Sequence, residues 1–104
     1  MKNIENCLTR QQLVIIEFRK EAELIATAID HLINQGNFIA AQQHIFDLSN
    51  YSKMLGATQL YEATTTLNQN LEKGLIDQNI YQHFQQQLKE TIEAINWIKL
   101  PGHY

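Results

Sequence analysis

The sequence contains few of the residues that fix a small protein through covalent bonds or metals. One cysteine, Cys7, occurs among 104 residues, which excludes an internal disulfide and a cysteine-based zinc site and is typical of a reducing compartment. The single proline, Pro101, lies at the C-terminus, so nothing before it breaks a helix outright. No apolar run approaches the roughly 20 residues that span a bilayer, and residues 1–10 lack the apolar core of a signal peptide. We therefore expect a cytoplasmic protein that does not enter the membrane.

Positive charge is also scarce. Eight Lys and Arg stand against eleven Asp and Glu, which gives a net charge of −3, and the basic residues form no stripe. This balance argues against a general affinity for nucleic acid, because the phosphate backbone favours clustered Lys and Arg. The hydrophobic content of 44% is that of a globular protein. We expect one domain over residues 1–104, and Met1 together with the terminal "LPGHY" favours an independent small protein.

What the sequence does contain is helical periodicity. Apolar residues recur at alternating steps of three and four in four segments, which predicts helices over about 10–34, 38–55, 58–73 and 78–99. The apolar stripes are Ile15, Phe18, Ala22, Ile25, Ile29 and Leu32; Phe38, Ala41, Ile45, Leu48, Ser52 and Leu55; Leu60, Thr64, Leu67 and Leu71; and Tyr81, Phe84, Leu88, Ile92, Ile95 and Ile98. Short loops make sequential helices antiparallel neighbours. The sequence therefore predicts an all-α, antiparallel up-down-up-down four-helix bundle.

Residues that begin and end helices stand at the ends of these segments. Thr9 and Gln12 match the capping box, in which each side chain satisfies a backbone N–H of the other. Asn37 and Asp77 are suitable N-caps for the second and fourth helices. Gly56 fits the left-handed position that ends many helices.

One stretch carries a more specific pattern. "LSNYSKMLGATQLYEATTTLNQNLEKG" begins at Leu48 and contains Leu-Gly-Ala, a following Leu and a Leu-Glu pair near the end of the next helix. With "LINQGNF" before it, the chain resembles a histidine-containing phosphotransfer (HPt) domain, the helical module of bacterial and fungal phosphorelays, over nearly its whole length. The positions that match are Leu48, Leu55, Gly56, Ala57, Leu60, Leu71 and Glu72. The resemblance implies a bundle that acts in two-component signalling by docking on receiver domains or histidine kinases.

The reactive core of the family is altered in this chain. The family reads His-x-Leu-Lys-Gly, and the resemblance places Phe46 at the histidine, Ser49 at the lysine and Asn50 at the glycine. Phenylalanine has no nitrogen nucleophile, serine has no charge to offset phosphoryl oxygens, and asparagine adds bulk where a receiver approaches. Asn68 falls near the glutamine that orients the histidine in many members. The resemblance implies a degenerate member that is not an enzyme and needs no cofactor.

Phe46 permits two interpretations. Its benzyl group folds over the edge of the core, or it anchors a partner as a large apolar group among few charges. In the family the corresponding face docks a receiver domain through an apolar patch. The candidate partner-binding face, taken from the helical wheel and the resemblance, is Ile39, Gln42, Phe46, Ser49, Asn50, Lys53 and Asn68.

Two other functions stay open. The first is active phosphotransfer by an atypical histidine, for which His44 is the candidate near the site. His44 precedes Phe46 by two residues and points to a different face of the helix. The second is a helical adaptor or oligomerisation bundle outside signalling. Such a bundle could form a weak homodimer through a patch of side chains that share one side of the second helix, namely His44, Asp47, Tyr51 and Met54.

The remaining polar residues predict no catalytic or metal centre. His44 and Asp47 are three residues apart on one face, but two ligands without a third and fourth make a weak metal site. Glu17 and Glu21 also share a face. Because Arg19 and Lys20 lie between them in sequence, we interpret the pair as part of a solvated charged surface and not as an acid–base pair.

Overall fold

The computed structural model describes residues 9–100 and contains four helices in that range. They are α1 (Arg10–Asn34), α2 (Phe38–Leu55), α3 (Thr58–Glu72) and α4 (Gln78–Asn96). No strand occurs between residues 9 and 100, so the predicted all-α class is confirmed. Cys7 and Pro101 lie outside the described residues. The expectations that rest on them, a reducing compartment and a helix-breaking residue only at the C-terminus, are therefore not tested by the structure.

The predicted N-caps are confirmed by hydrogen bonds. The backbone N–H of Gln12 donates to Thr9 Oγ1 at 3.1 Å, and the N–H of Thr9 donates to Gln12 Oε1 at 2.8 Å, which completes the capping box. Asn37 Oδ1 accepts from the N–H of Ala40 at 3.2 Å. Asp77 accepts from two backbone N–H groups in the first turn of α4. Local sequence therefore determines where α1, α2 and α4 begin.

The end of α2 depends on a left-handed glycine. Gly56 has φ +72°, a conformation that side chains other than glycine rarely adopt. Its N–H donates to the carbonyl of Lys53, and the N–H of Ala57 donates to the carbonyl of Ser52. These bonds satisfy carbonyl groups that the last turn of a helix otherwise leaves unpaired.

The predicted end of the fourth helix is wrong by three residues, since α4 ends at Asn96 and not at residue 99. The carbonyl groups at this end have a partner from the far end of the sequence. Arg19 on α1 donates through Nη2 to the carbonyl of Ile95 at 2.8 Å and also to that of Ile98. Ile98, which the periodicity assigned to the apolar stripe, lies beyond the helix and is exposed. The end predicted for the third helix is one residue too long.

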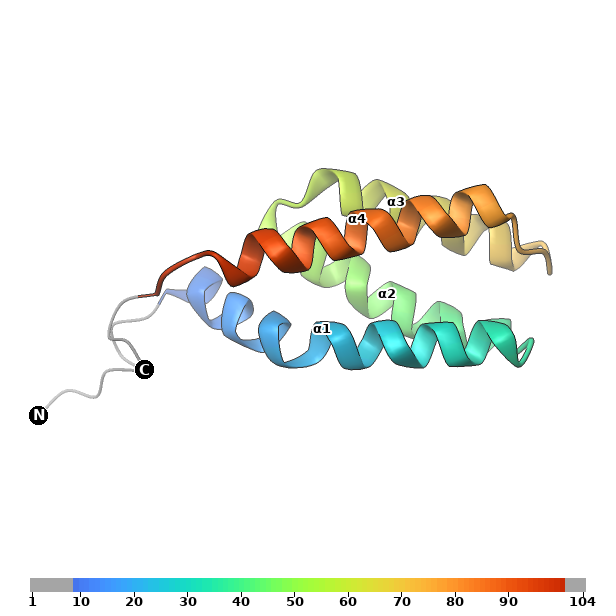
Figure 1. Cartoon of the computed structure of the whole chain (residues 1–104), viewed down its shortest axis with the longest axis horizontal. Helices are drawn as coiled ribbons and strands as arrows, with labels where there is room; N and C mark the ends of the chain where they lie inside the picture. Colours follow the sequence, from blue (N-terminus) through green and yellow to red (C-terminus); the bar gives the residue numbers. More distant parts are fainter. Residues whose placement is uncertain (1–8, 101–104) are drawn as a thin grey trace, which may run out of the picture.

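The four helices lie along the long axis of the molecule (Figure 1), and the colour gradient runs in opposite senses along successive helices. Close contacts join α1 to α2, α2 to α3, α3 to α4, and α4 to α1. Each helix therefore packs against two neighbours in a ring. The contact between α1 and α4 is the sparsest of the four.

The apolar stripes meet in one core. The buried residues predicted from the periodicity are Ile15, Phe18, Ala22, Ile29, Ala41, Ile45, Leu48, Ser52, Leu60, Thr64, Leu67, Leu71, Tyr81, Phe84, Leu88 and Ile95. The two polar members are satisfied, because Ser52 Oγ donates to the carbonyl of Leu48 and Thr64 Oγ1 to that of Tyr61. None of the helices in residues 9–100 has the length and apolar content needed to cross a membrane.

Candidate functional site

Phe46 lies on the outer side of α2 and not in the core. Its side chain is 59% exposed, whereas that of the preceding residue, Ile45, is fully buried. Ile39, two helical turns before Phe46, is 75% exposed. Of the two interpretations of Phe46, the exposed fraction favours a surface group over one that fills the edge of the core.

A shallow hollow lies beside Phe46, where α2 faces α3. It is lined by Ile39, Gln42, Gln43, Phe46, Asp47 and Asn68. The side chain of Gln42 crosses from α2 to α3, and its Nε2 donates to the backbone carbonyl of Asn68 at 3.3 Å. The structure thus brings together four of the predicted site residues, one of them from a different helix. Gln43 was not predicted, and Asp47 was predicted for the alternative patch with His44, Tyr51 and Met54 and not for this face.

Asn68 has an unusual polar atom. Its Oδ1 is buried and has no hydrogen-bond partner among the described residues. Buried acceptors are nearly always paired, and leaving one unpaired costs about 1–3 kcal/mol. Asn68 lines the hollow, but its Oδ1 is closed off from the surface, so a donor group that enters the hollow reaches this acceptor only when the side chain turns.

The other predicted residues lie apart from the hollow. Ser49 Oγ donates to the carbonyl of Phe46 at 2.7 Å, so this hydroxyl is occupied by its own helix. Lys53, near the end of α2, places its Nζ 5.9 Å from the ring centroid of Tyr61, a cation–π contact. Asn50 faces the other neighbour of α2 and lines a recess against α1. The predicted face is therefore divided between two sides of α2.

That recess, the α1–α2 groove, has a volume of about 350 Å³. Its lining residues are Glu17, Glu21 and Ile25 of α1 and His44, Asp47, Asn50, Tyr51 and Met54 of α2. The four residues that the sequence grouped as an alternative patch thus do lie together. His44, the alternative phosphoacceptor, shares the groove with three carboxylates, whose charge disfavours the approach of an anionic phosphoryl group.

Tyr51 reports the electrostatic character of the α1–α2 groove. Its ring packs edge-on against Phe18 with the ring centroids 5.7 Å apart. Burial raises the pKa of the Tyr51 phenol above its usual value, and the negative charges of Glu17 and Glu21 raise it further. A phenol is neutral near pH 7 even at its usual pKa, so the charge of the groove is that of its carboxylates.

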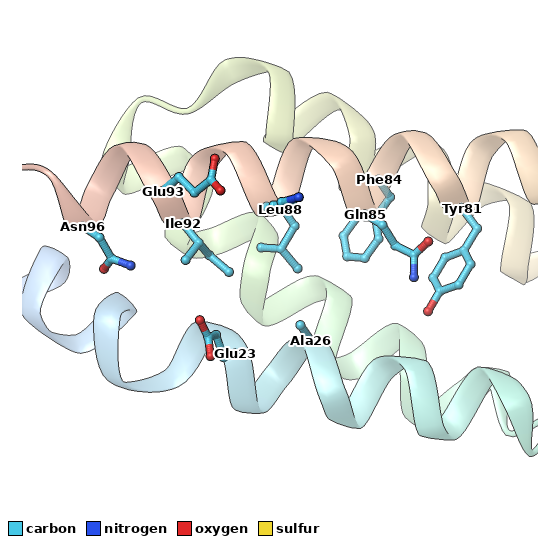
Figure 2. Close-up of a pocket in the computed structure, with 10 residues that line it drawn as sticks. Glu23, Ala26, Tyr81, Phe84, Gln85, Leu88, Ile92, Glu93 and Asn96 are labelled. Carbon is cyan, nitrogen blue, oxygen red and sulfur yellow. The ribbon is translucent and has the colours of Figure 1, made fainter.

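Sequence reasoning missed a third recess, between α1 and α4, with a volume of about 440 Å³. Figure 2 shows Phe84, Leu88 and Ile92 pointing from α4 toward α1, with Ala26 and Glu23 opposite them. The charged residues that line this recess are of both signs, namely Glu23, Lys89 and Glu93. Such a mixture indicates no particular charge for a ligand. Periodicity gives no signal for this recess, because its residues belong to the ordinary core stripes and their edges.

Within residues 9–100 no group of three or more His, Cys, Asp or Glu side chains is arranged to hold a metal ion. Comparison with models of known protein families gives no match. Comparison with curated proteins gives none, and comparison with solved structures gives none.

Proposed function

We propose that the chain is a non-catalytic, HPt-like module of cytoplasmic two-component signalling that binds a receiver domain or a histidine kinase through the face around Phe46. The observation that carries the proposal is the 59% exposure of a large aromatic side chain on α2, at the position where the resemblance puts the phosphoacceptor histidine. A side chain at that position is exposed to a partner. The benzyl group of phenylalanine can make an apolar contact there, but it has no nitrogen that could accept a phosphoryl group.

The HPt-like, antiparallel up-down-up-down arrangement is part of the same proposal. It is supported by the ring of sequential contacts between helices and by the opposite senses of the colour gradient in Figure 1. Leu55, Gly56 and Ala57, the residues of the family's Leu-Gly-Ala, form the end of α2 and its left-handed turn. These local features are consistent with the register that assigns Phe46 to the histidine position.

The surroundings of Phe46 favour binding. Asp47 is the one charged residue among those that line the hollow beside it, so little charge has to be desolvated when a partner covers it. Gln42 is already held by its bond to Asn68, which reduces the entropy that binding would cost. Rotation of the Asn68 side chain on binding would let its unpaired Oδ1 accept from a donor group of the partner.

The binding test compares two exposed apolar side chains on different faces. Phe46→Ala is expected to weaken the affinity for the cognate receiver domain or kinase by roughly 30-fold, the effect of losing one hot-spot anchor. Leu24→Ala is the matched control, because Leu24 on α1 is 67% exposed and remote from the hollow in sequence. Calorimetry with purified partners measures both. Equal affinities of the wild-type and Phe46→Ala proteins would exclude Phe46 as the anchor.

A restoration experiment tests the register and the absence of catalysis. The triple substitution Phe46→His, Ser49→Lys and Asn50→Gly rebuilds the family's reactive core on α2. It is expected to accept acid-labile phosphate from a phosphorylated receiver, whereas the wild-type chain accepts none. Label on His44 of the wild-type chain would instead support the alternative of an active phosphotransfer protein.

A further inference from the structure

The α1–α2 groove combines negative charge with apolar surface. Glu17 and Glu21 line it from α1 and Asp47 from α2, while no Lys or Arg lines it. Its apolar surface comes from Ile25, Tyr51 and Met54, and the last of these is 55% exposed. The groove therefore differs from the hollow beside Phe46, whose lining is mainly uncharged.

The basic residues nearest in sequence do not neutralise this charge. Arg19 lies between Glu17 and Glu21 in sequence, but its guanidinium donates to the carbonyl groups of Ile95 and Ile98 at the end of α4. Lys20 is exposed and does not line the groove. Glu17 and Glu21 are both exposed, as a solvated charged surface requires, but neither basic neighbour lines the groove with them.

We propose that the α1–α2 groove is a second docking surface, which takes a helical segment of a partner protein that presents Lys or Arg beside apolar side chains. Charge complementarity carries the choice of occupant, because the three carboxylates flank an apolar surface from both helices. A groove of about 350 Å³ between two helices has room for a few side chains, which a helical segment presents along one face.

A second copy of this chain is the poorer occupant. A two-fold interface contains the same patch from both copies, so it would bring together two sets of Glu17, Glu21 and Asp47. Like charges brought together in this way oppose association. The inference uses the charge and shape of the groove alone and does not depend on the proposed signalling function.

The first test uses short synthetic helical peptides in place of the unidentified partner. A peptide of Leu and Lys is expected to bind with an affinity that falls as salt is added, and a matched peptide of Leu and Glu is expected not to bind. The variant Glu17→Gln/Glu21→Gln/Asp47→Asn should weaken binding of the Lys peptide by about tenfold or more. Fluorescence anisotropy measures each affinity.

The matched control removes the same total charge elsewhere. Glu62, Glu72 and Glu90 are exposed on α3 and α4, so Glu62→Gln/Glu72→Gln/Glu90→Gln should change the affinity much less. Equal loss in both triple variants would mean that the acidic chain attracts the peptide without a specific site, and it would overturn the proposal. Absence of binding to the wild-type protein would do the same.

The apolar part of the groove has its own test. Met54→Ser is expected to weaken the Lys peptide about threefold to tenfold, because an exposed apolar contact is lost. An unchanged affinity would contradict an apolar contribution. Phe46→Ala should leave peptide binding unchanged, which separates failure at this groove from failure of the proposed function at Phe46.

Discussion

α1 packs against its two neighbours in different ways. Against α2 it makes many close contacts along its length, and core side chains such as Phe18 and Ile45 are almost completely buried. Against α4 it makes the sparsest contact in the bundle, with a recess of about 440 Å³ between the helices. The recess lies between two polar links, the bonds of Arg19 to the end of α4 and the bond of Tyr81 to Asp30.

The difference between these two contacts shows that the bundle contains two kinds of helix–helix interface. Apart from the α1–α2 groove, the interface between α1 and α2 depends on apolar packing, whose contribution grows with the area that is buried. The interface between α1 and α4 has fewer close contacts and adds specific hydrogen bonds at two points, each of which contributes a modest amount of free energy. Substitutions at the two interfaces should therefore differ in size and in their sensitivity to pH.

The largest effect is expected in the centre of α2. Leu48 is fully buried, and Leu48→Ala should reduce the free energy of unfolding by about 2–5 kcal/mol, through lost burial and a cavity. Ile92, half-buried beside the α1–α4 recess, is the comparison. Ile92→Ala should cost less than half as much, since the surface there is already open. Urea denaturation measures both, and equal losses would mean that the two interfaces are packed alike.

The link at Tyr81 should give the next largest effect. Tyr81 donates from its hydroxyl to Asp30 Oδ1 at 2.8 Å, and its side chain is only 7% exposed. Tyr81→Phe removes a hydrogen bond to a charged group and should destabilise the fold by about 1.5–3 kcal/mol. Asp30→Asn keeps an acceptor at this position and should cost less.

The same link predicts a pH dependence. Burial, and then the bond to Asp30, raise the pKa of Tyr81 well above its usual value of 10.0. The folded protein therefore holds this proton at a pH where the unfolded chain has released it. Its contribution to stability is complete below pH 10 and is lost as the pH rises above that value. Urea midpoints measured from neutral pH to above pH 10 should fall more steeply for the wild type than for Tyr81→Phe, and parallel curves would contradict this account.

A smaller effect is expected at Arg19. Arg19→Ala removes the donor to the carbonyl groups at the end of α4 and should cost about 1 kcal/mol, because the bonds are partly open to water. Arg19→Lys retains the charge but not the forked geometry and should recover only part of the loss. Amide hydrogen exchange in the last turn of α4 gives a local readout. Lys20→Ala, an exposed change on the same helix, should leave that exchange unaltered.

The smallest effect on stability is expected at Phe46. Since 59% of its side chain is exposed, Phe46→Ala should change the free energy of unfolding by no more than about 0.5 kcal/mol. A larger loss would revive the interpretation that Phe46 covers the edge of the core. Thermal denaturation of Phe46→Ala and Leu24→Ala side by side provides the check.

Sequence predicted the helices well where local residues determine them. The bounds of α1 and α2 agree with the prediction, because Thr9, Gln12, Asn37 and Gly56 lie within a few residues of the ends that they cap. The end of α4 does not agree, because its carbonyl groups are capped by Arg19, which is 76 residues away from Ile95. Neither the apolar periodicity nor the capping residues of the sequence can predict a contact over that separation.

The candidate site shows the same division. A helical wheel correctly puts Ile39, Gln42 and Phe46 together, because all three belong to one helix. It does not show which neighbouring helix each edge of that face meets, and so it grouped Asn50 with Phe46 although Asn50 turns toward α1. The sequence likewise could not show that Asp47 of α2 lines the same groove as Glu17 and Glu21 of α1, because that depends on how the two helices pack.

The bonds of Arg19 also bear on the order in which the protein assembles. α1 is synthesised first and α4 last. The hydrogen bonds from the Arg19 guanidinium to the carbonyl groups of α4 therefore cannot form until nearly the whole chain has left the ribosome. Closing such a long loop is slow compared with forming a single helix. The backbone amides in the last turn of α4 should therefore become protected from hydrogen exchange late in folding, after α1 and α2 have packed their apolar side chains against each other.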